Sequence, residues 1–476
     1  MSMNREITRR GFLAATAGAG WALSGACARG GKSGIARAAS RSDAPWRAGL
    51  AEVMITPRKP VWMTGYGSRA KPSEGTLLDL HAKALALEDE SGARSVLVGT
   101  DLLGFPAGVA QNIAGQVKKR HGLSRDRLML TSTHTHGGPA LHAPTHFLYG
   151  PRSTPEQWRD VEDYTRELEE SVVKVVGAAL DGLRPARLRF GHARADFAIN
   201  RREKTDAGVK IGVNPQGPVD PDVPFLRIES ETGDLRGVVF GYACHNTTLG
   251  GDIYQFHGDY AGFAQTRLET NHPGAVALFV EGCGGDANPN PRGKVEQARE
   301  YGEALASAVD NALRGSLRPV GGPLKTVFDV FPIPFAKPPS AEELRAKSQQ
   351  KDIFAQWHAK EMLKQLERDG RLPAEYPYPV QVWQFGRDLT LIAMAGEVVV
   401  DYALRLKREL GADNVWVAGY CNDVFAYIPS QRVLEEGGYE GGGAMVIYVQ
   451  PGPFAPAVED TIIARIHKAV ERARVK

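Results

Sequence analysis

The chain of 476 residues is about three times as long as a typical domain, and its hydrophobic share of 42% and charged share of 24% are those of a globular protein. Its 58 Lys and Arg against 55 Asp and Glu give a net charge of +3, which excludes binding to nucleic acid or a membrane surface through bulk charge. Four cysteines in this length exclude a disulfide scaffold. The charge is uneven: residues 1–42 carry seven basic and one acidic side chain, whereas the remainder carries 51 basic and 54 acidic ones.

The N-terminal segment predicts export from the cytoplasm. A twin-arginine motif at residues 8–13 is followed by a weakly apolar stretch over 14–26, which is too short and too weak for a transmembrane helix. We therefore expect a twin-arginine signal peptide over 1–28, a flexible linker over 29–45, and a periplasmic or secreted mature protein. Lipid anchoring at Cys27 is the less favoured alternative, and no transmembrane segment is expected elsewhere.

From Trp46 onward, strand-like runs alternate with helical patterns, which predicts the α/β class with mixed β-sheets flanked by helices. No internal repeat or later linker divides the chain, so we expect one large domain over 46–476. The predicted strands are 94–101, 127–133, 186–197, 235–243, 275–280, 380–385 and 389–394. The predicted helices are 107–121, 155–183, 260–271, 295–313, 398–410, 458–473 and, within a helical insertion over 337–378, a long charged helix over 341–371.

A pair of histidines follows the strand predicted over 127–133. His134 and His136 stand in Thr-His-Thr-His-Gly-Gly-Pro, where a strand runs into a glycine loop. Side chains two residues apart on a strand point to the same face, so both imidazoles can converge on one ion. The pair is typical of the first half of a metal site.

Three further predicted strands stop at polar residues beside glycine. His245 follows the strand over 235–243, Asp286 lies in a glycine-rich loop after the next, and Glu397 follows Gly396. Ligands of α/β sheets bind at the carboxyl ends of strands, so these side chains together favour a metal site over unrelated capping loops. The sequence contains no phosphate-binding loop, dinucleotide fingerprint or nucleophile elbow.

In order along the chain, the motifs resemble the neutral/alkaline (non-lysosomal) ceramidase family in its N-terminal catalytic domain. Tyr427 and Tyr439 have the spacing found in that family. The segments that carry the resemblance are 48–53 with 65–67, 133–139, 198–201, 245–262, 285–290, 396–397 and 419–442.

The resemblance implies a zinc amidase that cleaves the N-acyl bond of ceramide or a related N-acyl lipid. It implies one Zn²⁺ per chain, held by His134, His245, Glu397 and Tyr427. A zinc ion with an open position polarises a carbonyl and lowers the pKa of a bound water, which is the chemistry that amide hydrolysis needs.

The resemblance also implies roles around the metal. His136 would stand behind the ligands and orient them or the water. Arg201 and Tyr439 would line the site and hold the oxyanion that develops on the carbonyl. The proton for the leaving nitrogen could come from His136, Asp286 or Tyr439, and the sequence does not choose among them.

Two departures from the family pattern affect the expected function. The family's Gly-Asp-Val-Ser-Pro-Asn is Gly-Asp-Ala-Asn-Pro-Asn here, so its Ser is replaced by Asn288, which cannot be a nucleophile. A zinc-activated water is then the expected nucleophile, and Asn288 is expected to bind substrate or the oxyanion.

The family's further C-terminal β-sandwich domain is not expected in this chain. The alternatives are a zinc hydrolase of the same fold acting on another ester, amide or carbohydrate-derived substrate, and a non-catalytic binding protein.

The expected partner is a lipid or small-molecule substrate, and no binding to nucleic acid is expected. Peripheral contact with a membrane is compatible with the sequence. The segments 147–149 and 331–335 could form the wall of an acyl-chain groove or could belong to ordinary packing. Cys244, Cys283 and Cys421 lie in the site motifs; we favour small buried core residues over a Cys244–Cys283 bridge. The oligomeric state stays open.

Overall fold

The structure is a computed structural model that describes residues 45–143 and 148–474. The expected signal peptide, nearly all of the expected linker, and Phe147 lie outside the described residues. No helix within the described part of the chain is long and apolar enough to cross a membrane.

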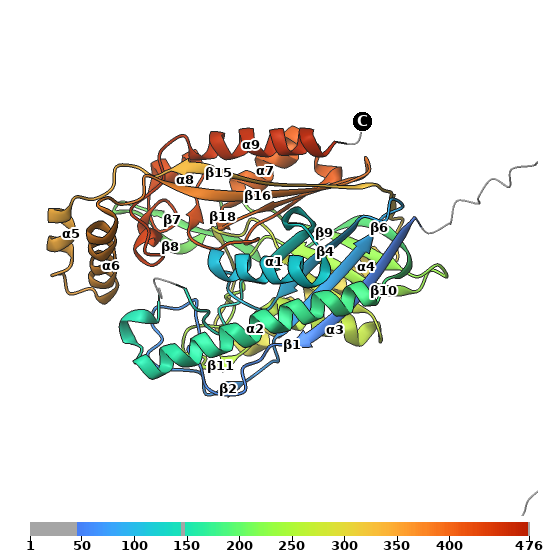
Figure 1. The fold of residues 1–476 in the computed structure, drawn as a ribbon, viewed down its shortest axis with the longest axis horizontal. Coiled ribbons are helices and arrows are strands. Elements are labelled where there is room, and N and C mark those ends of the chain that lie inside the picture. The colour runs from blue at the N-terminus through green and yellow to red at the C-terminus, as the bar shows by residue number, and fades with distance from the viewer. Residues whose placement is uncertain (1–44, 144–147, 475–476) are drawn as a thin grey trace, which may run out of the picture. The chain divides into compact units, whose positions relative to one another are not determined.

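The larger of the two sheets at the centre of the fold is a nine-stranded mixed sheet (Figure 1). Most neighbouring strands are antiparallel, whereas β4–β5 and β10–β12 are parallel. The order across the sheet is β12 (Val276–Glu281), β10 (Leu235–Tyr242), β9 (Asp222–Glu229), β6 (Arg184–Arg194), β1 (Trp46–Met54), β3 (His81–Glu88), β4 (Arg94–Thr100) and β5 (Leu128–Ser132), with β14 (Arg318–Val320) paired to β6.

A second, four-stranded sheet packs on one face of the first. Trp46 of the large sheet and Phe385 of the smaller one are in ring contact at 5.9 Å, inside a shared core that also contains Trp383 and Trp416. The strands of the smaller sheet are β15 (Leu324–Pro334), β16 (Glu375–Phe385), β17 (Leu389–Met394) and β19 (Val415–Ala418).

Helices cover the two outer faces, which gives four layers in the order helix, sheet, sheet, helix (Figure 1). The large sheet is covered by α1 (Ala107–His121), α2 (Pro155–Asp181), α3 (Asp259–Asn271) and α4 (Val295–Leu313), and the small sheet by α7 (Val400–Leu410) and α9 (Val458–Ala473). The α/β class with mixed sheets flanked by helices is confirmed. Local signals explain the helix bounds: at α2, Thr154 and Gln157 form a capping box around Pro155.

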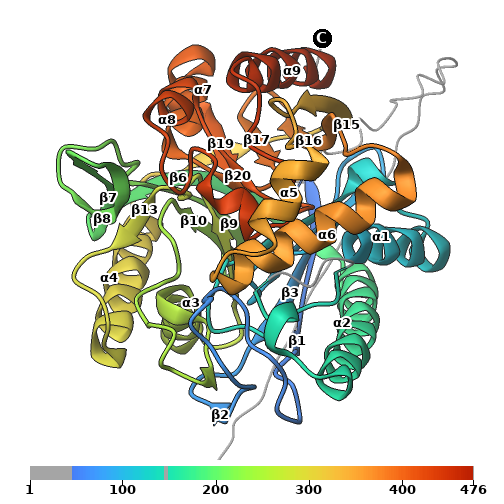
Figure 2. The ribbon, with the colours of Figure 1, turned by 90° about the vertical axis from the view of Figure 1, so that its left-hand side faces the viewer.

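The long helix predicted over 341–371 is wrong in one respect, because the structure divides it into α5 (Ala341–Lys347) and α6 (Ile353–Asp369). The side chain of Asp352 accepts a hydrogen bond from the backbone N–H of Ala355 at 2.8 Å and starts a new helix. Figure 2 shows α5 and α6 side by side.

Short elements complete the fold. They are the sheet of β13 (Ala287–Pro289), β7 (Ala198–Thr205) and β8 (Gly208–Asn214), the pairs β18 (Glu397–Val398) with β20 (Tyr427–Ile428) and β2 (Gly75–Thr76) with β11 (Gln255–Phe256), helix α8 (Gln431–Glu436), and the 3₁₀ turns η1 (Arg125–Arg127), η2 (Gly150–Arg152), η3 (Ala412–Asn414) and η4 (Gly443–Val446).

Candidate active site

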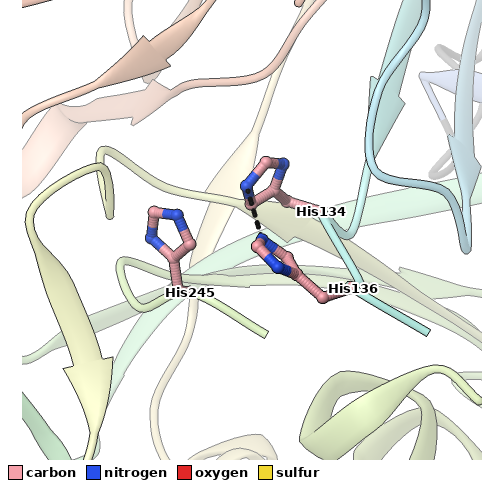
Figure 3. A group of neighbouring side chains, drawn as sticks. All are labelled: His134, His136 and His245. Atoms are coloured by element: carbon pink, nitrogen blue, oxygen red, sulfur yellow. Dashed lines mark hydrogen bonds between the residues drawn. The ribbon is translucent and has the colours of Figure 1, made fainter. Parts of the chain in front are cut away.

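Three buried histidines meet where strands of the large sheet end (Figure 3). His134 and His136 follow β5, and His245 follows β10. One ring nitrogen from each lies within 4.8 Å of the other two, so the group could hold a metal ion. The backbone at His134 has φ +56°, a conformation that is uncommon outside glycine and that turns this side chain into the group.

Two backbone carbonyls fix the tautomers of His134 and His245. The Nδ1–H of His134 donates to the carbonyl oxygen of Leu103 at 2.6 Å, and the Nδ1–H of His245 donates to that of Gly284 at 2.7 Å. Carbonyl oxygens only accept, so each neutral ring keeps its Nε2 lone pair for the centre of the group. Burial lowers the pKa of His245 to about 4 and that of His136 well below its usual value, which favours neutral rings.

Glu397 and Tyr427 complete the group. The Oε2 atom of Glu397 lies 3.1 Å from Nε2 of His134 and 3.0 Å from Nε2 of His245, and the Tyr427 hydroxyl lies 3.3 Å from the latter. The pKa of Glu397 is held well below its usual value, against the effect of burial, so the side chain enters the group as a carboxylate. Burial raises the pKa of the Tyr427 phenol.

The chemistry and spacing of these donors fit a divalent metal ion. Metal–ligand bonds of about 2.0–2.1 Å in tetrahedral geometry separate two ligands by roughly 3.3 Å. The observed separations of 3.0–3.3 Å are close to that value. Lone pairs and a carboxylate that face one another without a proton between them are stabilised by a cation.

Arg201 brings a buried positive charge beside this group. Its guanidinium on β7 donates to the Tyr427 hydroxyl at 2.8 Å, to Oε1 of Glu440 at 2.8 Å, and to Oδ1 of Asn288 at 3.3 Å. Burial acts to lower the pKa of Arg201, but the surrounding Tyr427, Glu440 and Glu397 raise it well above its usual value. The side chain therefore stays charged.

Asn288 and Asp286 differ in the groups that they contact. Asn288 on β13 is buried and accepts from Arg201 and from the Thr247 hydroxyl, the latter at 3.2 Å. Both oxygens of Asp286 are engaged: one accepts from the backbone N–H of Val400 at 2.8 Å at the start of α7, the other from the side chain of Asn200 at 3.0 Å. Burial raises the pKa of Asp286 to about 6. Its contacts support the framework of the site.

The structure thus brings together eight of the nine site residues named from the sequence. Tyr439 joins through its ring, whose centroid lies 5.3 Å from that of Tyr427. His136 differs from the expectation, because its Nε2 lies 3.3 Å from Nε2 of His134, at the same short range as the expected ligands. The eight are His134, His136, His245, Glu397, Tyr427, Arg201, Asn288 and Tyr439, whereas the side chain of Asp286 bonds to Asn200 and Val400 instead.

Four further residues escaped the sequence reasoning. The Tyr448 hydroxyl donates to Oε1 of Glu397, and Glu440 holds Arg201. The Tyr420 ring is tilted against that of His134, with 4.2 Å between centroids, and the Tyr66 ring meets that of His136 edge-on at 4.7 Å. Tyr66, Tyr420 and Glu440 lie inside the family-like motifs, which was the available signal, whereas Tyr448 lies beyond them.

The structure also decides the state of the cysteines and the place of segment 331–335. Cys244, Cys283 and Cys421 are buried free thiols, so the alternative of a Cys244–Cys283 bridge is wrong. The segment 331–335 belongs to the core under α9, where Phe331 and Ile333 are buried, rather than to a groove wall.

The fold and the buried donor group together define an α/β protein with a candidate metal centre. Residues 46–328 match the family described as neutral/alkaline non-lysosomal ceramidase, N-terminal, and the chain belongs to this family.

Relatives in the family are distant. The chain is 27% identical over 262 residues to neutral ceramidase of Pseudomonas aeruginosa, a match that covers 53% of this chain and 38% of that protein. It is 23% identical over 465 residues to neutral ceramidase of Mycobacterium tuberculosis, covering 80% and 71% of the two chains. The fold matches the crystal structure of the Pseudomonas aeruginosa enzyme with a TM-score of 0.71 at 20% identity, covering 91% of this chain and 76% of that one.

Proposed function

We propose that the protein is an exported, zinc-dependent hydrolase that cleaves the N-acyl amide bond of ceramide or a related N-acyl lipid. Family membership supports the reaction class. The observation that carries the metal is the buried group in which His134, His245, Glu397 and Tyr427 lie at metal-ligand separations. We assign these four as ligands of one Zn²⁺. A zinc ion held by these residues would polarise the scissile carbonyl and lower the pKa of a water that could then attack it near neutral pH.

His136 is the best candidate to carry the proton to the leaving nitrogen. The rings of His134 and His245 are locked by their Nδ1–H bonds to carbonyls, whereas Nδ1 of His136 has no hydrogen-bond partner among the described residues. Either nitrogen of His136 can therefore hold the proton. Asp286 is a weaker candidate because both of its oxygens already accept hydrogen bonds.

Arg201 and Asn288 form the polar wall beside the ligands. The Arg201 guanidinium holds the Tyr427 hydroxyl and places positive charge where a carbonyl oxygen would become negative. Because Oδ1 of Asn288 accepts from Arg201 and Thr247, its amide N–H groups are left to donate to a substrate oxygen. Tyr439 adds a phenol to the same wall.

The experiment is a substrate panel with the zinc-loaded protein. Ceramide and matched N-acyl, ester and glycoside substrates are compared between wild type, His245→Ala and the control His272→Ala, whose partly exposed ring pairs with Asp310. Ceramide hydrolysis by wild type and the control, and none by His245→Ala, supports the proposal. Hydrolysis that persists in His245→Ala contradicts it.

The second candidate is a zinc hydrolase of the same fold with another ester, amide or carbohydrate-derived substrate. The observation that favours it is Asn288 at the position of the family's Ser. Activity on another member of the panel and none on ceramide would select it.

Export by the twin-arginine route rests on the motif at residues 8–13 alone. A reporter fused to residues 1–40 should move to the periplasm, and replacing Arg9 and Arg10 by Lys should stop it. Export that is unchanged by the double replacement would overturn this part of the proposal.

A further inference from the structure

The segment formed by α5 and α6 packs against the turn over residues 447–450, which directly follows η4. Helix α6 contacts both η2 and η4, and it crosses the face of the molecule that is turned to the viewer in Figure 2. Its core with α5 includes Val449, which is 5% exposed. The members of that core are Leu344, Ala359, Met362, Leu372 and Val449.

Three consecutive residues of this turn make contacts in different directions. Tyr448 is buried and its hydroxyl donates to Oε1 of Glu397. Val449 packs into the α5–α6 core. The carbonyl oxygen of Gln450 accepts from Nε2 of His358 on α6 at 2.7 Å. The turn therefore links α6 directly to the carboxylate beside the histidines.

The backbone of Val449 supports the same link. Its φ is +54°, which is a genuine outlier for a β-branched residue. Such a conformation persists only where its surroundings hold it in place. At Val449 those surroundings are the α5–α6 core on one side and the Tyr448–Glu397 hydrogen bond on the other.

We propose that Tyr448 is a positioning residue for Glu397 and that the α5–α6 segment sets its position through Val449. This proposal rests on the proposed metal centre. The carboxylate has two oxygens, and Oε2 faces His134 and His245. The Tyr448 hydroxyl occupies Oε1, which fixes the rotation of the carboxylate and directs Oε2 at the metal position.

The experiment measures Zn²⁺ affinity of the full chain by competition with a chromophoric chelator, together with the visible spectrum of the Co²⁺ form. The variants are Tyr448→Phe, Met362→Ala and their double variant. The matched control is Tyr164→Phe, which removes an equally buried hydroxyl that donates at 2.7 Å to the carbonyl of Ile55, a residue outside the site. Thermal unfolding of the metal-free forms checks folding.

Tyr448→Phe should weaken Zn²⁺ binding by about 10–100-fold, the usual effect of removing a group that orients a ligand, and should shift the Co²⁺ spectrum. Tyr164→Phe should change neither. Met362→Ala should weaken binding less, and the double variant should bind no more weakly than Tyr448→Phe, because both changes act through one contact.

Wild-type affinity in Tyr448→Phe would overturn the positioning role. Fully additive losses in the double variant would overturn the role of the α5–α6 segment. If wild type and Tyr164→Phe bind no Zn²⁺ at all, the metal centre itself falls, and that result is distinct from a loss confined to Tyr448→Phe.

Discussion

Glu397 and Tyr427 stand opposite each other in the parallel pair of β18 and β20, and both reach Nε2 of His245, at 3.0 and 3.3 Å. Side chains that face each other across paired strands lie on one side of the sheet. The backbone register, rather than two flexible side chains, therefore sets the distance between this carboxylate and this phenol.

Gly65 leaves room for the ring of His136. A Cβ at this position would come within 2.5 Å of Cγ of His136, and the backbone has φ +96°. Gly65→Ala should therefore displace His136 and lower kcat, with zinc retained. The control is Gly92→Ala, at φ +79° with open space around it, which carries the backbone cost alone. Equal kcat values for the two variants would contradict the account.

Asn288 tests the identity of the nucleophile. Asn288→Ser restores the residue type of the family but shortens the side chain that accepts from Arg201 and Thr247. We expect a loss in kcat/KM of about 10-fold, equivalent to roughly 1.4 kcal/mol, at unchanged zinc content. A large gain in ceramide hydrolysis would instead assign the attack to a serine hydroxyl.

Glu440 balances two buried arginines, and its Oε1 and Oε2 atoms each lie 2.8 Å from one of them, Arg201 and Arg202. Glu440→Gln should lower the free energy of unfolding by about 3–5 kcal/mol, because it leaves buried charge uncompensated. Denaturant titration measures the change. Glu436→Gln, at the edge of the same network, serves as the control and should cost clearly less. Similar losses in both would contradict a special role for Glu440.

His257 gives a pH signature apart from the candidate metal ligands. Burial lowers its pKa to about 3, whereas an unfolded histidine titrates near 6.5. Between these values the unfolded state binds a proton that the folded state does not, so stability falls as pH drops from about 6.5 toward 3, by about 1.4 kcal/mol per pH unit. Between pH 6.5 and pH 3, the free energy of unfolding should therefore fall more steeply with decreasing pH in metal-free wild type than in metal-free His257→Asn. Parallel stability curves for the two proteins would rule it out.

Local signals in the sequence predicted most helices well, since periodic apolar residues and capping residues determine where a helix runs. The bounds of α1 and α4 agree with the prediction. The break before α6 was missed because the cap at Asp352 lies inside a continuous charged pattern. Strand β15 was missed as well, and its Pro332 and Pro334 argue against a strand when read alone.

The candidate site divides in the same way. The histidines at the strand ends and Glu397 could be predicted as site residues because each stands in a local sequence motif. Tyr448 and Glu440 were not, because their partners lie far away in sequence: the Arg201–Glu440 contact joins residues 239 apart. Only the folded chain brings such groups together.

His134, His245, Glu397 and Tyr427 are the four ligands that we assign to one metal ion. Elemental analysis of the purified full chain tests this assignment most directly. We expect about one zinc per wild-type chain and none in His134→Ala or Glu397→Ala, with hydrolysis lost in both. Full zinc occupancy in either variant would contradict the account.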